Sequence, residues 1–386
     1  MAVVRPEMAS FHTPRALVLA AVFFSGFAAA GLLVLKPLLV GALIDDYHYT
    51  AALAGFVAGI EMAGIGISSL LFATMGAAWN RRLVMVIGAS LGILGSIAPV
   101  VSDAYVPLLL SRLMAGMGCG LISAVVLSVI GTDRNPDRTF SWYYLIAFGG
   151  SALLVPVGVW AISRFLVAGG YILLAVLLVF VFLAANIFPS VARNEPKGRI
   201  YTTHSAIRTM PALWSLGLSL FYWIGFGGVW AFIERLGIRA NLSHAAIGSV
   251  LSLGPLASIA GAISASILHT RLGRIPILLA CIALVMISVV MLGWVSSRSS
   301  FVVAVLAISY VWPLFLAYLG GTMAAIDPTG RVVAMSVASQ TLGMAIGPAA
   351  AGVAAGYFGY VGIAAMALIC CTMALVCLGM LVWSRR

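Results

Sequence analysis

Long apolar runs alternate with short polar segments along the entire chain. A helix that crosses a membrane needs about 20 mostly apolar residues, and each of these runs is long enough. Because several neighbouring runs are separated by only a few residues, we expect tight connections between antiparallel helices. The pattern predicts twelve spanning helices: residues 15–43, 51–74, 82–101, 105–130, 140–163, 168–189, 211–234, 245–268, 275–296, 301–325, 332–356 and 360–383.

The longest polar stretch divides these helices into two sets of six. It reads PSVARNEPKGRIYTTHSAIRTMP, from residue 189 to 211. We therefore predict a first six-helix bundle over residues 1–189, a cytoplasmic linker over 190–210 and a second six-helix bundle over 211–386.

Two segments of the first half recur at matching places in the second. GAAWNRRL at 76–83 corresponds to LHTRLGRIP at 268–276, and GGSALLVPVG at 149–158 corresponds to GMAIGPAAAG at 343–352. Such repeats are typical of a transporter built from two duplicated units.

Composition supports an all-α integral membrane protein. The chain is 63% hydrophobic and only 8% charged, whereas a soluble domain is about half apolar and a quarter charged. Most of its outer surface must therefore face lipid. The net charge of +11 is spread in ones and twos between apolar runs, which does not form the basic patch expected of a nucleic-acid-binding protein.

The basic residues also predict the orientation. With the N-terminus inside, inner segments hold 15 lysines and arginines and outer segments hold 4. Positive residues concentrate in cytoplasmic loops, so we expect a multi-pass protein of the cell membrane, in a bacterial inner membrane, with both ends in the cytoplasm.

One spanning helix carries an arginine followed by glycines, in the stretch LLLSRLMAGMGCGLISAVVLSVI at 108–130. The pattern of Arg112, Gly116, Gly118 and Gly120 resembles the fourth helix of the major facilitator superfamily, and the resemblance extends over the chain. It implies a twelve-helix fold of two pseudo-symmetric six-helix halves and secondary transport by alternating access.

The loop after the second predicted helix resembles the family's conformational motif, although the aspartate of that motif is missing. The resemblance assigns the conformational role to small residues and arginines in both halves. These are Gly76, Arg81, Arg82, Gly116 and Gly120, and in the second half Arg271, Gly273, Arg274, Gly347 and Pro348.

A further motif resembles the glycine-proline pair of the family's antiporters. In the fifth predicted helix Val155 stands before Pro156 in place of glycine, so the match is partial. The intact pair, Gly347 and Pro348, lies in the eleventh. Antiport is therefore left open by the motif.

Three ionisable residues lie inside predicted spans of the first half: Lys36, Glu61 and Arg112. At about 1.5 Å per residue all three fall at a similar depth below the outer surface, so we expect them to meet. Ionisable residues within a membrane are candidates for function. They either bind a substrate or a proton, or Glu61 only neutralises a buried cation.

Two rows of side chains in the second half carry aromatic rings at helical spacing. One contains Trp223, Trp230 and Glu234, and the other contains Tyr310 and Tyr318. The resemblance implies that these helices line the cavity, and rings with polar tips suit an amphipathic organic substrate. Two alternatives remain, because aromatic residues also gather at membrane interfaces and Glu234 can pair with Arg235 at the rim.

The leading prediction is a proton-coupled transporter that exports a small amphipathic compound. Uptake of an organic anion, favoured by Lys36 and Arg112, is the alternative. The sequence shows no catalytic constellation, ATP-binding loop or pore filter, so an enzyme and a channel are disfavoured. We expect a substrate, a proton and membrane lipid as partners, a monomer, and no cofactor or metal. Asp45 and Asp46 are predicted to lie in an exposed outer loop.

Overall fold

The structure is a computed structural model of the chain. It describes residues 14–75, 79–101, 104–133, 136–189, 209–268, 273–295, 297–327 and 331–384. Within these ranges almost every residue is helical and no strand occurs, which confirms the predicted all-α class.

The first half contains six α-helices and one turn of 3₁₀ helix. They are α1 (Arg15–Val34), α2 (Lys36–Asp46), α3 (Ala51–Met75), α4 (Arg81–Val101), α5 (Tyr105–Gly131), α6 (Pro136–Ala184) and the 3₁₀ turn Ala185–Ile187.

The second half repeats this pattern of long helices with one short one. It contains α7 (Met210–Ala231), α8 (Ile233–Arg239), α9 (His244–Leu268), α10 (Arg274–Val290) with a π-helical extension (Met291–Val295), α11 (Arg298–Ile326) and α12 (Arg331–Trp383).

The described ranges hold ten helices that are long and apolar enough to span a membrane. Two of them, α6 with 49 residues and α12 with 53, far exceed the ~30 Å apolar thickness of a bilayer. Each is interrupted by a residue with positive φ, Leu166 at 56° and Gly359 at 63°, where the chain reverses. The ten helices therefore make twelve crossings, which confirms the predicted fold.

The first crossing differs from its prediction, because the run 15–43 is not one continuous helix. It breaks at Leu35, between α1 and α2. Pro37 stands in the first turn of α2 and has no N–H to donate to the carbonyl four residues earlier, that of Leu33. The break places Lys36 in the interior, where only 2% of its surface is exposed.

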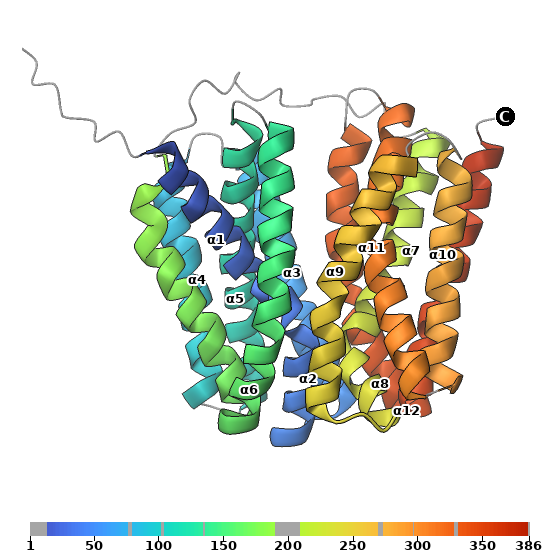
Figure 1. Cartoon of the computed structure of the whole chain (residues 1–386), viewed down its shortest axis with the longest axis horizontal. Helices are drawn as coiled ribbons and strands as arrows, with labels where there is room; N and C mark the ends of the chain where they lie inside the picture. The colour runs from blue at the N-terminus through green and yellow to red at the C-terminus, as the bar shows by residue number, and fades with distance from the viewer. Residues whose placement is uncertain are drawn as a thin grey trace, which may run out of the picture.

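The helices form two bundles that stand side by side (Figure 1). α1 begins and α12 ends on one side, called here the terminal side, while α2 and α8 lie on the opposite, distal side. The figure shows that the bundles approach one another most closely on the distal side.

Glycines allow close approach of backbones within each bundle. A Cβ on Gly116 of α5 would collide with the carbonyl oxygen of Glu61 on α3, and one on Gly120 would collide with Ser68 and Ile65. In the second half, Gly347 of α12 packs in the same manner against Ile224 of α7. Small residues at such crossings are how membrane helices pack without a hydrophobic driving force.

The two bundles also touch through small residues. A Cβ on Gly55 or Gly59 of α3 would meet the carbonyl oxygens of Pro348 and Ala345 on α12. The side chain of Val159 on α6 fills the space beside Gly248 of α9. These contacts run from the distal ends of the helices toward their middle.

Replacement of Gly116 by alanine tests this packing. We expect a loss of about 1–3 kcal/mol in the free energy of unfolding, because the added methyl group overpacks against the backbone of Glu61. The matched control is Gly149→Ala in α6, where a Cβ would meet nothing within 4 Å. Thermal melting of purified protein should show a lower midpoint for Gly116→Ala alone, and equal midpoints would contradict the packing.

Candidate functional site

The structure brings the three ionisable residues of the first half together. Lys36 from the start of α2 places Nζ 3.4 Å from Glu61 Oε1. Arg112 of α5 places Nη1 3.3 Å from Glu61 Oε2. One carboxylate on α3 therefore receives a cation on each oxygen, and at most 4% of any of the three residues is exposed.

Both cations have further partners inside the bundle. Lys36 donates to the carbonyl oxygen of Ala58, at 3.2 Å, and Arg112 donates to that of Gly95 on α4. The Arg112 guanidinium also stands 4.4 Å from the centre of the Tyr171 ring, a cation–π contact that strengthens when it is shielded from water.

The cluster carries a formal excess of one positive charge, because two cations share one carboxylate. Arg112 Nε has no hydrogen-bond partner among the described residues. A buried charge is tolerated only when it is paired and hydrogen-bonded, so the arrangement is stable as a unit and sensitive to the loss of Glu61. In this conformation Glu61 contacts both cations, and each cation also contacts a backbone carbonyl.

A cluster of aromatic rings occupies the second half, on facing sides of α7 and α11. Rings of Trp223 and Phe226 are 5.1 Å apart, and Phe226 is 5.1 Å from Trp312. Tyr222 stacks on Phe315 with centroids 3.6 Å apart. The cluster, called here the aromatic wall, consists of Tyr222, Trp223, Phe226, Trp230, Trp312 and Phe315.

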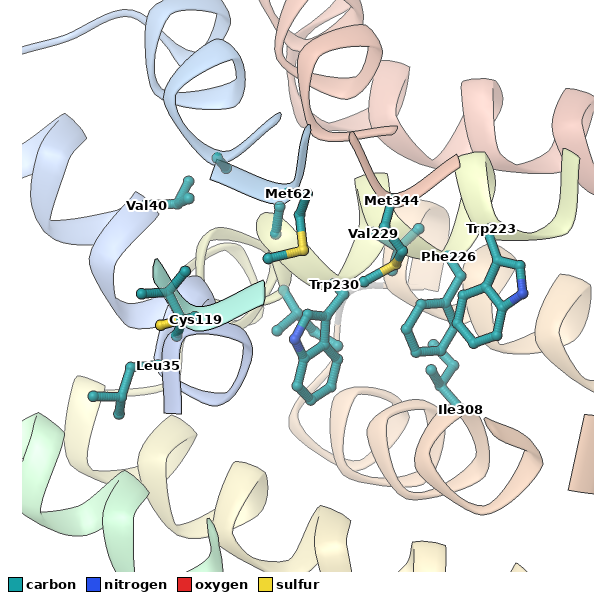
Figure 2. Packing of buried hydrophobic residues seen from close by; sticks show 14 of the residues in the cluster. Leu35, Val40, Met62, Cys119, Trp223, Phe226, Val229, Trp230, Ile308 and Met344 are labelled. Atoms are coloured by element: carbon teal, nitrogen blue, oxygen red, sulfur yellow. The ribbon is translucent and has the colours of Figure 1, made fainter. Parts of the chain in front are cut away.

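Trp230 extends this wall to the first half. Figure 2 shows its indole between Phe226 and Trp223 on one side and Leu35 and Cys119 on the other. Its Nε1 donates to the carbonyl oxygen of Leu33, at 3.2 Å. That carbonyl is the acceptor left unpaired within the helix by Pro37, so the break in the first crossing provides a contact point for the other half.

Sequence reasoning found two of the six residues of the aromatic wall. Trp223 and Trp230 belong to it, whereas Tyr222, Phe226, Trp312 and Phe315 were not predicted. A missed signal was the three-residue step from Trp312 to Phe315, which puts two rings on one helix face.

The two tyrosines predicted on α11 are both at least partly shielded from solvent. The carbonyl oxygen of Tyr310 lies against Gly261 of α9. Tyr318 is buried, with 5% of its surface exposed.

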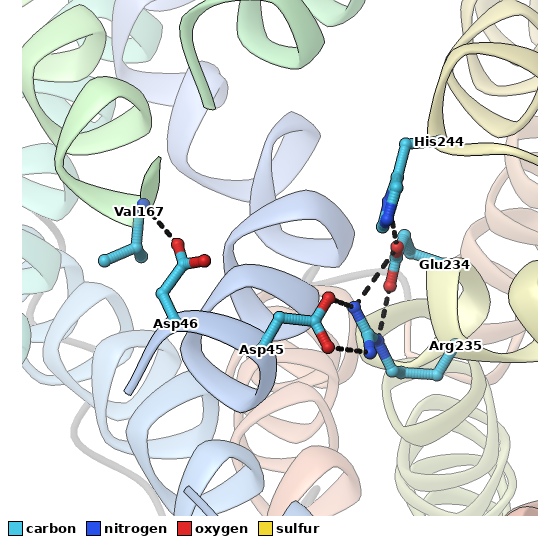
Figure 3. A network of polar contacts seen from close by, with 6 residues as sticks. All are labelled: Asp45, Asp46, Val167, Glu234, Arg235 and His244. Carbon is cyan, nitrogen blue, oxygen red and sulfur yellow. Dashed lines mark hydrogen bonds and ion pairs between the residues drawn. The ribbon is translucent and has the colours of Figure 1, made fainter. Parts of the chain in front are cut away.

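Glu234 lies at the distal rim, in a network of ion pairs. Its Oε2 accepts from Arg235 Nε at 2.6 Å, and its Oε1 lies 2.8 Å from His244 Nδ1. Arg235 also forms a two-pronged contact with Asp45 of α2 (Figure 3). Asp45 is exposed as predicted, but the loop assignment was wrong, because Asp45 and Asp46 both belong to the last turn of α2.

The residues assigned a conformational role are described in part, since Gly76 and Arg271 lie outside the described residues. Arg81 donates to Ser128 of α5 at 2.6 Å, and Arg82 donates to the carbonyl oxygen of Phe188 at 2.5 Å. Both bonds stay within the first half. Gly273 has φ of 74° before α10, and the side chain of Arg274 lies against Gly321 of α11.

In the described ranges no group of three histidine, cysteine, aspartate or glutamate side chains is arranged to hold a metal ion.

The family follows from comparison with known proteins. The family model of the Major Facilitator Superfamily matches residues 17–338. The chain therefore belongs to the Major Facilitator Superfamily, a family of transporters, and is a multi-pass membrane protein. A search of the curated proteins found no match.

Solved structures share the fold. The nucleoside transporter NupG is 13% identical, with a TM-score of 0.78 over 96% of this chain and 98% of that one. The transporter PepTSo2 is 13% identical, with a TM-score of 0.74 over 95% and 97%. A bacterial homolog of the human lysosomal transporter Spinster, captured inward-facing and unoccupied, is 14% identical, with a TM-score of 0.68 over 96% and 95%.

The arrangement of two cations around one carboxylate can be tested by removing one charge at a time. Glu61→Gln leaves two buried cations without a counter-charge, and loss of one partner from a buried ion pair costs about 3–5 kcal/mol. Lys36→Met instead leaves Glu61 and Arg112 as a neutral pair. We expect Glu61→Gln to lower the melting temperature of the purified protein more than Lys36→Met does, and the reverse order would contradict the shared carboxylate.

Proposed function

We propose that this protein is a secondary active transporter that exports small amphipathic compounds with an aromatic part, in exchange for protons. The aromatic wall carries the proposal. Its rings pack on one another between α7 and α11, Trp312 is only partly buried, and Trp230 extends the wall to the boundary between the halves. Such rings bind a flat apolar body while indole and phenol groups orient a polar end.

Contacts between the halves support alternating access. Asp45 with Arg235, Leu33 with Trp230, and the glycines of α3 with α12 join the halves from the distal side to the middle. The structure thus corresponds to a state closed on the distal side. Rocking of one bundle against the other would open that side and expose the wall to it.

We further propose that both chain ends are cytoplasmic, so that the distal side faces outward, and that one copy is sufficient for transport within its lipid surroundings. The excess of basic residues in the segments that the sequence predicts to be inside supports this orientation. Glu61 is the proposed proton carrier, and Lys36 and Arg112 modulate it. The division into residues 1–189, 190–210 and 211–386 remains a prediction.

Uptake of an organic anion is the second candidate. The excess positive charge of the cluster and the unpaired Arg112 Nε favour it. However, Lys36 and Arg112 are both engaged by Glu61 and hidden from solvent, so an anion would first have to displace the carboxylate. Trp312 of the wall is only partly buried and needs no such displacement, which favours an amphipathic compound over an anion.

A binding experiment distinguishes the two substrate classes. We expect ethidium, an aromatic cation, to raise the melting temperature of the purified protein, since ligands stabilise the state they bind, and succinate to have no effect. Trp312→Ala should weaken ethidium binding by about tenfold, which corresponds to ~1.4 kcal/mol. Trp312→Phe should retain binding. The control is Trp294→Ala, an exposed ring outside the wall, and stabilisation by succinate alone would favour uptake of an anion.

Proton coupling is tested by Glu61→Gln in reconstituted vesicles. We expect the variant to lose ethidium accumulation driven by a pH gradient, because its amide cannot exchange a proton. Counterflow of ethidium without a gradient should remain, which separates uncoupling from misfolding. If gradient-driven accumulation and its pH dependence stay at the wild-type level, Glu61 is not the proton carrier.

A further inference from the structure

Four side chains close the distal rim between the two halves (Figure 3). Asp45 belongs to α2 of the first half, whereas Arg235, Glu234 and His244 belong to α8 and the start of α9. Arg235 Nη1 lies 2.7 Å from Asp45 Oδ1, while its Nε bonds Glu234 at 2.6 Å. One guanidinium is thus shared between a carboxylate across the boundary and a carboxylate of its own half.

The Asp45 side of this contact is anchored in its own bundle, and α2 also packs closely against Glu234 across the boundary. Asp46, next to Asp45, accepts the backbone N–H of Val167 at 2.6 Å, where the second part of α6 begins. A Cβ on Gly41 of α2 would collide with the Glu234 carboxylate. A change in the attraction between Asp45 and Arg235 therefore acts on whole bundles rather than on a loose surface loop.

His244 connects the buried carboxylate with solvent. The Glu234 side chain is only 2% exposed, whereas the His244 side chain is 60% exposed. A neutral imidazole with its hydrogen on Nδ1 already donates to Glu234, so a second proton on Nε2 adds a charge without breaking a bond. The Glu234 carboxylate stabilises that charged form by Coulomb attraction.

Protonation changes the charge that faces Asp45. With a neutral imidazole, Arg235 and Glu234 of the second half sum to zero. With an imidazolium, the same group carries +1 and attracts the carboxylate of Asp45 more strongly. The negative charge of Glu234 is then neutralised by the imidazolium of His244. The positive charge of Arg235 is therefore available to attract Asp45 across the boundary.

We propose that His244 and Glu234 form a proton-binding site open to the distal solution, and that its protonation strengthens the Asp45–Arg235 contact and holds the distal side closed. The inference rests on the proposed alternating access, but not on Glu61 or on the direction of transport. The ligand of this site is a proton, and its binding shifts the protein toward the state closed on the distal side.

Other charged groups around the rim set the balance. Asp46 adds negative charge beside Asp45, and His48 acts on Asp45 from the first half, so protonation of His48 would oppose the effect. Tyr360 of α12 also interacts with Arg235. Exposed cations on the same side are Arg239 at the end of α8, and Arg164 and Arg298 on α6 and α11, the helices that pack against α9.

Distances between spin labels test the proposal without a transport assay. Ser163, just before the reversal of α6 at Leu166, and Ser299, at the start of α11, are exposed, uncharged and in opposite halves. The five native cysteines are buried, so Ser163→Cys and Ser299→Cys direct the labels. In full-length protein we expect the ratio of short to long distances to rise about fivefold or more as the pH falls from ~8 to ~5, the range in which histidine titrates.

Variants identify the responsible group. His244→Gln should hold the distances at their high-pH distribution throughout, and His48→Gln is the control that should keep the response. Asp45→Asn should shift the distances toward long values at every pH. The proposal is overturned if wild-type distances do not change with pH, if His244→Gln responds like the wild type, or if Asp45→Asn leaves the response intact.

The same labels in a Glu61→Gln background separate this inference from the proposed coupling. A retained pH response supports the rim site whether or not that variant transports by a gradient. Loss of the response in Glu61→Gln, with His244 intact, would contradict a site that acts at the rim by itself.

Discussion

A carboxylate held between two cations, away from water, is the interaction on which the first half depends. Glu61 accepts Lys36 on one oxygen and Arg112 on the other. Its backbone carbonyl is also the surface on which Gly116 packs. The crossing of α3 and α5 therefore fixes the packing distance and the ion-pair distance together. Such a triad adds little to the stability of the fold by itself, but removal of its single anion strongly lowers the free energy of unfolding.

The break at Leu35 links this cluster with the boundary between the halves. Pro37 turns the first crossing into two helices, places Lys36 at the start of the second, and leaves the Leu33 carbonyl for Trp230. The hydrogen bond between Trp230 and Leu33 can be replaced by water when the halves separate. Because the net contribution of such an exchange is only about 0.5–1.5 kcal/mol, this contact orients the closed state without locking it.

The fold and the meeting of three charges were predictable, because the lengths of the apolar runs and the rise of a helix fix depth. The aromatic wall was predictable only in part. Trp312 and Phe315 face α7, but a count in four-residue steps along α11 selects Tyr310 and Tyr318 instead. Asp45 was assigned to a loop because the polar residues around it are typical of a loop. Its partner Arg235 is 190 positions away, so the ion pair could not be predicted from nearby sequence. Contacts between the halves depend on how the two bundles dock, and this cannot be inferred from the sequence around each residue.

The two kinds of contact in the molecule differ in a way that suits rocking. Within the second half, large rings interlock, with Tyr222 stacked on Phe315 and Trp223 edge-on to Phe226. Between the halves, glycines touch carbonyl oxygens and charged side chains meet at the rim. Separation of interlocked rings would open voids and forfeit dispersion contacts, whereas water can replace polar contacts at the rim. Under the proposed alternating access, each bundle would move as a unit, because motion at the boundary between them requires the least free energy.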